Sequence, residues 1–155
     1  MTGVNRILMK NTVAILSITL LGLASCGGDT GNPTSTHSNT TVVKDDSPYN
    51  AGKIVYQKTC ITCHQSDGKG LQGTYPPLAG SDYLLADKLR AIRLVLKGSS
   101  GKITVNGNEY QGVMTPQVLN DNDVAQVLNY VYHSFGNNGP SVNPSEVKSV
   151  RDTLK

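Results

Sequence analysis

Apolar residues recur at steps of three and four along two stretches of the chain, and such a repeat predicts an amphipathic helix. The stretch 81–97 contains one repeat, formed by Leu84, Leu85, Leu89, Ile92 and Leu96. The stretch 120–135 contains the other, whose expected buried face is Val124, Val127, Leu128 and Val131. A side chain that can cap a helix stands at the start of each stretch, and a glycine follows the end of each.

Weaker patterns predict three further elements. A helix from Tyr49 to about residue 60 mixes an apolar stripe with polar positions. A short terminal helix begins at Pro144, because proline suits the first helical position and the preceding asparagine can cap it. Between 102 and 111, the pair Asn106-Gly107 suits a type I′ turn and predicts a small β-hairpin. The chain from 49 to 155 is therefore expected to be one all-α domain with a single hairpin.

The first 25 residues have the pattern of a secretory signal peptide. A short basic start precedes an apolar run over 12–23 that is too short for a confident membrane span. The run ends in Leu23-Ala24-Ser25-Cys26, which resembles a bacterial lipobox. That resemblance implies cleavage before Cys26 and lipidation of its thiol, so that acyl chains hold the mature protein on a membrane.

Residues 26–48 are predicted to be the lipidated cysteine and a flexible linker. Gly, Thr, Ser, Asn and Asp dominate this stretch, which cannot bury enough apolar surface to order itself. The net formal charge of the whole chain is +3, and loss of Arg6 and Lys10 with the signal peptide lowers it by two. A near-neutral mature protein gives no indication of nucleic acid binding.

The chemistry of the chain is concentrated in Cys60-Ile61-Thr62-Cys63-His64. Two cysteines separated by two residues and followed by histidine indicate covalent attachment of a c-type haem. The two thiols bind the vinyl groups of one porphyrin, and the histidine is the proximal iron ligand. The chain has three cysteines, so with one lipidated and two bound to haem none is left for a disulfide. A zinc or thiol-redox site is disfavoured, since there is no second cysteine pair and no βαβ pattern around this one.

Met114 is the candidate for the second iron ligand. It is the only methionine outside the signal peptide, and it lies in an expected loop between Gly112 and Pro116. Its alternative role is a gap-filling core side chain. His133 is the main rival ligand, although a position near a helix C-terminus suits a histidine without any metal. On the proximal side, the Pro76 carbonyl is the candidate acceptor for the other ring N–H of His64, and the alternative is a simple turn.

Taken together, these residues resemble a class I monohaem cytochrome c of the lipoprotein type. The resemblance covers nearly all of 49–151 and rests on Gly52, Tyr56, the haem motif, the 75–80 stretch, Met114 and Tyr130. It implies three main helices around one haem, with the first and last crossing at Gly52 near Tyr130. The stretch 101–114 is similar to cytochrome c domains of copper nitrite reductases and to cytochrome c subunits of respiratory complexes. Those relatives often have proline directly after the methionine, whereas Thr115 intervenes here.

The leading functional hypothesis is a membrane-tethered one-electron carrier of a bacterial respiratory chain, not an enzyme. It would lie on the periplasmic side of the cell envelope, with a quinol-oxidising complex as donor and a terminal oxidase or nitrite reductase as acceptor. Near-neutral charge predicts docking that depends only modestly on salt. One alternative is a fixed cytochrome c subunit of a larger respiratory complex. Another, from a different class, is a haem enzyme or gas sensor with a labile sixth ligand.

Overall fold

The computed structural model describes residues 46–155. The predicted signal peptide, the lipidation site at Cys26 and nearly all of the predicted linker lie outside these residues. Within them, no helix is both long enough and apolar enough to cross a bilayer.

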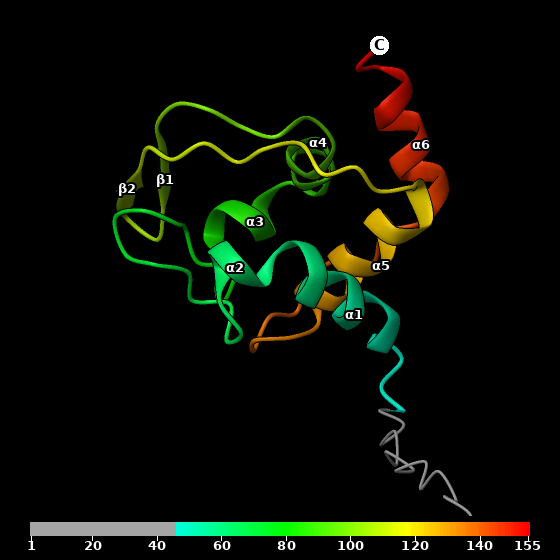
Figure 1. Cartoon of the computed structure of the whole chain (residues 1–155), viewed down its shortest axis with the longest axis horizontal. Coiled ribbons are helices and arrows are strands. Elements are labelled where there is room, and N and C mark those ends of the chain that lie inside the picture. Colours follow the sequence, from blue (N-terminus) through cyan, green and yellow to red (C-terminus); the bar gives the residue numbers. More distant parts are fainter. Residues whose placement is uncertain (1–45) are drawn as a thin grey trace, which may run out of the picture. The chain divides into compact units, whose positions relative to one another are not determined.

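The described chain is mainly helical, as the sequence predicts (Figure 1). Its helices, in chain order, are α1 (Asn50–Thr59), α2 (Ile61–His64), α3 (Asp82–Ala86), α4 (Lys88–Lys97), α5 (Asp121–Tyr132) and α6 (Pro144–Asp152). The two strands β1 (Ile103–Val105) and β2 (Asn108–Tyr110) pair antiparallel, with Ile103 opposite Tyr110. The expected class of fold, all-α with one small hairpin, is confirmed.

The first and last main helices cross at Gly52, as the resemblance implies. A Cβ atom on Gly52 would lie 2.0 Å from the Gln126 carbonyl oxygen and 2.8 Å from Cβ of Tyr130. These distances are far below contact, so only glycine lets the backbones of α1 and α5 approach this closely. The crossing therefore fixes where the C-terminal end of α1 lies relative to α5.

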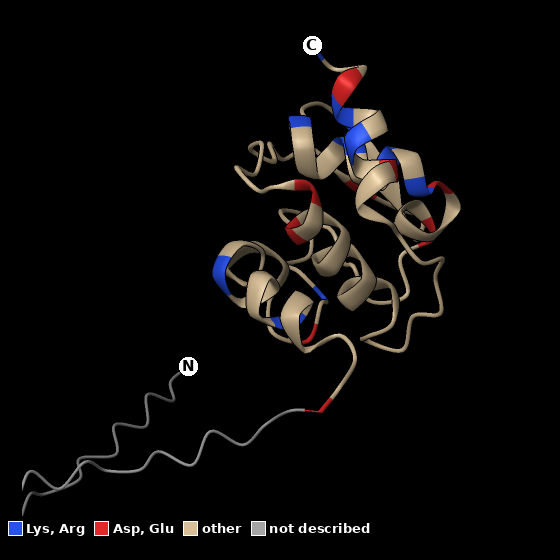
Figure 2. Cartoon of the chain, turned by 90° about the vertical axis from the view of Figure 1, so that its right-hand side faces the viewer, with Lys and Arg blue, Asp and Glu red and all other residues tan. Residues whose placement is uncertain are grey.

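The core is built on α5. The predicted buried face is confirmed, since Val124, Val127, Leu128 and Val131 are all at most 4 % exposed. Helices α1, α4 and α6 all pack against α5. Charged residues lie outside this core, and Figure 2 shows acidic and basic positions interleaved on the helices near the C-terminal end. Several of them pair, including Arg151 with Asp121.

Two helix boundaries differ from the prediction. The expected helix over 81–97 is interrupted at Asp87, whose backbone is extended and whose carboxylate accepts a hydrogen bond from the Arg90 amide at 2.9 Å. Asp87 is thus a second N-cap, and the direction of the helix changes there. Leu89, expected on the apolar face, follows this break and is 45 % exposed.

The helix expected to reach residue 135 ends at Tyr132 instead. Phe135 has a φ of 57°, so the chain turns sharply before it. This turn brings the Phe135 ring to a centroid distance of 5.4 Å from Tyr56 and 5.6 Å from Tyr130. Packing of the three aromatic rings against one another takes the place of a further turn of helix.

The hairpin has the turn that its sequence predicts. Asn106 and Gly107 have φ values of 49° and 77°, as a type I′ turn requires. The turn is also tied to the start of α3, because the Asn106 amide donates to the Asp82 carboxylate at 2.8 Å. In return, the Asp82 amide donates to the Asn106 side-chain oxygen at 3.0 Å.

The helix crossing gives a direct test. We expect Gly52→Ala to lower the free energy of unfolding of the haem-loaded protein by about 1–3 kcal/mol, because the new methyl group forces α1 and α5 apart. This loss exceeds the gain of roughly 0.5–1 kcal/mol that alanine brings to a helix interior. Urea unfolding followed by circular dichroism measures the change. Gln57→Ala, on the exposed side of the same helix, should change stability by less than about 0.5 kcal/mol, and equal stabilities for both variants would refute the constraint.

Candidate functional site

An apolar cavity of about 340 Å³ lies between α2, α4, the hairpin and the segment that follows it. It brings Met114 to the neighbouring residues Cys60, Cys63 and His64, and all four predicted site residues line it together with Pro76. The rest of its wall is largely aliphatic or aromatic. No Asp, Glu, Lys or Arg lines the cavity within residues 46–155.

The two cysteines are presented by one tight turn of chain. Cys60 is the C-cap of α1 and the N-cap of α2, and the His64 amide donates to the Cys60 carbonyl oxygen at 2.9 Å. The single turn of α2 therefore places both thiols and the imidazole on one wall of the cavity. Neither thiol is in a disulfide. Burial raises the pKa of the Cys60 thiol, an environment opposite to that of a reactive thiolate.

The His64 ring is held by the loop that follows it. Its Nδ1 lies 3.0 Å from the Pro76 carbonyl oxygen, which is the contact expected from the sequence. A carbonyl oxygen only accepts, so Nδ1 carries the proton and Nε2 is left as the nitrogen with a free lone pair. Burial lowers the pKa of His64, which also favours the neutral ring that binds metals.

The loop between α2 and α3 is fixed by its own backbone. The Gly70 amide donates to the His64 carbonyl at 3.0 Å, and the Leu78 amide donates to the Gly68 carbonyl at 2.7 Å. Gly70 has a φ of 64°, and a Cβ there would lie 2.3 Å from the Tyr75 carbonyl oxygen. These contacts hold Pro76 at a defined distance from the histidine.

Met114 reaches the cavity from a segment pinned to the end of α4. Its amide and carbonyl both bond to Ser99 at 2.9 Å, forming an isolated antiparallel bridge. Gly98 permits this approach, because a Cβ at Gly98 would lie 2.2 Å from the Met114 carbonyl oxygen. The sequence indicates Gly98 only as the end of a helix. It does not reveal that Gly98 also allows Met114 to approach α4.

His133, the rival ligand, does not line the cavity. It is the C-cap of α5, and its ring stacks on that of Tyr49 with centroids 4.6 Å apart. The ring therefore secures the start of the described domain to the end of α5.

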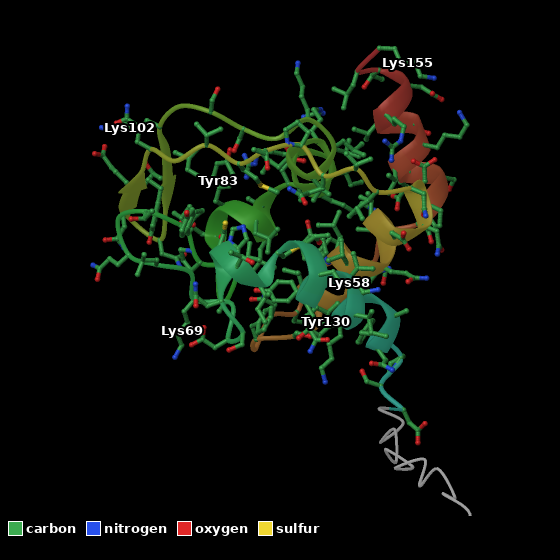
Figure 3. All side chains as sticks on the ribbon, viewed as in Figure 1. Lys58, Lys69, Tyr83, Lys102, Tyr130 and Lys155 are labelled. Atoms are coloured by element: carbon green, nitrogen blue, oxygen red, sulfur yellow. The ribbon has the colours of Figure 1, made fainter. Side chains whose placement is uncertain are left out.

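Two contacts beside the cavity carried no sequence signal. The Tyr56 hydroxyl donates to the Gln65 carbonyl oxygen at 2.6 Å, and burial raises the pKa of this hydroxyl. Tyr83, labelled in Figure 3, lines the cavity from α3, and the Arg90 guanidinium carbon lies 3.9 Å from its ring centroid. Each contact joins residues on either side of a break between two consecutive helical segments, and the position of that break was not predicted.

The donors fit a haem better than a bare metal ion. Within residues 46–155, no group of three or more His, Cys, Asp or Glu side chains could hold a metal ion. A porphyrin supplies four nitrogen ligands itself and needs only axial donors, two thiols and an apolar wall. Cys60 and Cys63 would hold the macrocycle, and His64 and Met114 are the available axial donors. The bound group would supply reversible one-electron chemistry at its iron.

Comparison with known proteins identifies the family. The sequence pattern of the cytochrome c family matches residues 49–134. The chain is 39 % identical over 90 residues to cytochrome c-552 of Thermus thermophilus, covering 55 % of this chain and 68 % of that protein. It is 32 % identical over 108 residues to the cytochrome c subunit of a quinone alcohol dehydrogenase of Gluconobacter oxydans, covering 67 % of this chain. It is also 33 % identical over 127 residues to a fructose dehydrogenase cytochrome subunit of Gluconobacter japonicus, covering 77 % of this chain.

The chain therefore belongs to the cytochrome c family, and the predicted class I monohaem type is confirmed. Membership implies one covalent haem c with its iron, and Cys60 and Cys63 occupy the attachment positions. The chain spans only 22 % and 25 % of the length of the two dehydrogenase subunits.

Removal of the two thiols tests the attachment. We expect the double variant Cys60→Ala, Cys63→Ala to lose its haem completely when the chain is denatured, because no thioether bond remains. Haem staining of a denaturing gel and intact mass measure this loss. Thr62→Ala, an exposed change between the two cysteines, should retain the full mass of the haem adduct. Haem that stayed on the double variant would contradict the assignment.

Proposed function

We propose that this protein is a membrane-tethered one-electron carrier whose haem iron is held by His64 and Met114. The observation that supports the proposal is that both side chains line the same cavity as the two cysteines, although they come from separate segments. The protein is an electron-transfer protein and not an enzyme, because two protein ligands leave no open iron position for a substrate.

The composition of the cavity wall also favours electron transfer over catalysis. Haem enzymes need acid–base groups near the iron to move protons. The described wall contains no carboxylate, lysine or arginine. An apolar wall that excludes water and charge favours fast exchange of an electron with little rearrangement.

The tether is supported by the sequence around Cys26. The apolar run and the small residues before this cysteine suit cleavage and lipidation. The domain would then lie on the periplasmic side of a bacterial membrane. We propose a quinol-oxidising complex as its donor and a terminal oxidase or nitrite reductase as its acceptor.

A fixed subunit of a respiratory complex is the second candidate. It is favoured by the similarity to cytochrome subunits of an alcohol dehydrogenase and a fructose dehydrogenase. In that case the haem would receive electrons from a dehydrogenase partner and pass them to the next acceptor. The lipid anchor is compatible with both functions.

The sixth ligand gives the sharpest test of the carrier. We expect Met114→Ala to open one iron position, so that the oxidised protein becomes high-spin and the reduced protein binds carbon monoxide. The midpoint potential should fall on the order of 0.1 V, because a thioether ligand raises it and axial ligands set haem potentials over about 0.8 V. Visible spectra and a redox titration measure these changes.

His133→Ala is the matched control for this test. It removes the rival ligand, which lies away from the cavity, and should leave the spectrum and the potential unchanged. A high-spin, carbon monoxide-binding native protein would instead support the enzyme or gas-sensor alternative.

The anchor is tested separately. We expect Cys26→Ser to abolish labelling by radioactive palmitate and to move the haem protein out of the membrane fraction, since no acyl chains are attached. Fractionation of cells with a haem stain measures this. Unchanged membrane association of the variant would exclude the lipid tether.

A second experiment distinguishes the two candidate functions. When native membranes are solubilised with detergent, a fixed subunit should co-purify with the other proteins of its complex, whereas a carrier should purify without them.

A further inference from the structure

We propose that Asn137 is a positioning residue for the proximal iron ligand, and that it lowers the haem potential by keeping the Pro76 carbonyl on the His64 ring. Asn137 does not line the cavity, so it acts through the loop between α2 and α3 and not by touching the haem. It also lies beyond residues 49–134, which the family pattern matches. The inference rests on the proposed function, in which His64 binds an iron that cycles between two oxidation states.

The Asn137 side chain joins the end of α5 to this loop. Its Nδ2 donates to the Leu78 carbonyl oxygen at 3.0 Å and to the Val131 carbonyl oxygen at 2.9 Å. Its Oδ1 accepts from the Gly80 amide at 2.8 Å. Two carbonyls that only accept and an amide that only donates require a side chain with two donors and an acceptor, and among side chains of this length only asparagine has them.

The turn after α5 places Asn137 against the loop. The Asn137 amide donates to the Ser134 carbonyl oxygen at 2.9 Å, and Phe135 and Gly136 have φ values of 57° and 77°. The Phe135 ring packs on the same loop, since a Cβ on Gly68 would lie 2.7 Å from its Cδ2 atom. Figure 1 shows the segment after α5 beside the loop that follows α2. The turn therefore holds the loop at two points.

The held part of the loop is closely connected to Pro76. Only Pro77 stands between Pro76 and Leu78, and the ring of Pro77 fixes its φ, which removes one torsion from this connection. The Pro76 carbonyl carbon is bonded to the Pro77 nitrogen, so a shift of Leu78 turns this carbonyl relative to the His64 ring. The 3.0 Å contact between the Pro76 oxygen and His64 Nδ1 thus depends on where Leu78 is held.

The hydrogen bond on His64 changes the haem potential in a defined direction. A carbonyl that accepts the Nδ1 proton makes the ring a stronger donor to the metal. A stronger donor stabilises the oxidised iron, which carries one more positive charge, so the potential falls. Loosening the loop should therefore raise the potential. Entry of water into the site has the opposite effect, because water also stabilises the more highly charged oxidised haem.

Asn137→Ala removes the side-chain amide without introducing a charge. At a fixed applied potential, we expect the ratio of reduced to oxidised protein to rise about threefold, where a tenfold rise would correspond to about 59 mV. Redox titration of the haem-loaded full chain measures this ratio. Asn138→Ala is the matched control, since Asn138 is the neighbouring asparagine and is exposed. This control should titrate as the native protein does.

Nuclear magnetic resonance of the reduced protein reports on the His64 proton itself. We expect the Nδ1 proton to exchange with solvent about tenfold faster in Asn137→Ala, because the loosened loop opens more often. Asn137→Asp keeps the size of the side chain and the acceptor for Gly80 but lacks both donors, so it should give the same faster exchange. Asn138→Asp is its control with the same change in charge. Where Asn137→Ala does not fold, this second pair carries the test.

The outcomes separate the two proposals. A raised ratio and faster exchange in the Asn137 variants, with the native visible spectrum, support the positioning role. An unchanged or lowered ratio in Asn137→Ala, or equal effects of substitutions at the two asparagines, overturns this role and leaves the carrier intact. A native protein whose iron is high-spin, or does not cycle reversibly between its oxidation states, overturns the proposed function instead.

Discussion

The close approach of α1 and α5 at Gly52 is the constraint from which the rest of the site follows. A side chain at position 52 would clash with the Gln126 carbonyl oxygen, so the position of Gly52 fixes where α1 crosses α5. The haem motif continues directly from α1, so the crossing also places Cys60, Cys63 and His64. Tyr56, one turn beyond Gly52, reinforces this by donating to the Gln65 carbonyl immediately after the motif.

The opposite wall of the cavity is attached to the same helix, α5, through α4. Met114 is positioned by Ser99 and Gly98 at the end of α4, and α4 in turn packs on α5 and α6. The two walls are joined through α5, on which α1 and α4 both pack. A haem bonded to one wall and ligated from the other would add a second connection between them, and its binding free energy would contribute to folding.

The sequence predicted those features that depend on local chemistry. The haem motif, the Asn106-Gly107 turn and the buried face of α5 each follow from residues close together in the chain. The break at Asp87 could not be predicted, because the apolar repeat continues through it and only the side-chain cap to Arg90 reveals it. The end of α5 at Tyr132 could not be predicted either, because the Phe135 ring that follows it packs on Tyr56 of α1, far away in the sequence. Met114 was a candidate ligand because it is the only methionine after the predicted signal peptide. The backbone bridge to Ser99 that positions it is visible only in the three-dimensional structure.

A nearly neutral net charge and a lipid tether would complement each other physically. Carriers with strongly charged faces attract partners over long distances, and that attraction weakens as salt rises. A domain of nearly neutral net charge lacks strong steering of this kind, so its encounter rate would depend on the local concentration of partners. The proposed lipid anchor at Cys26 would supply a high local concentration to any partner in the same membrane. The proposed tether would thus take the place of electrostatic attraction in bringing the domain to its partners.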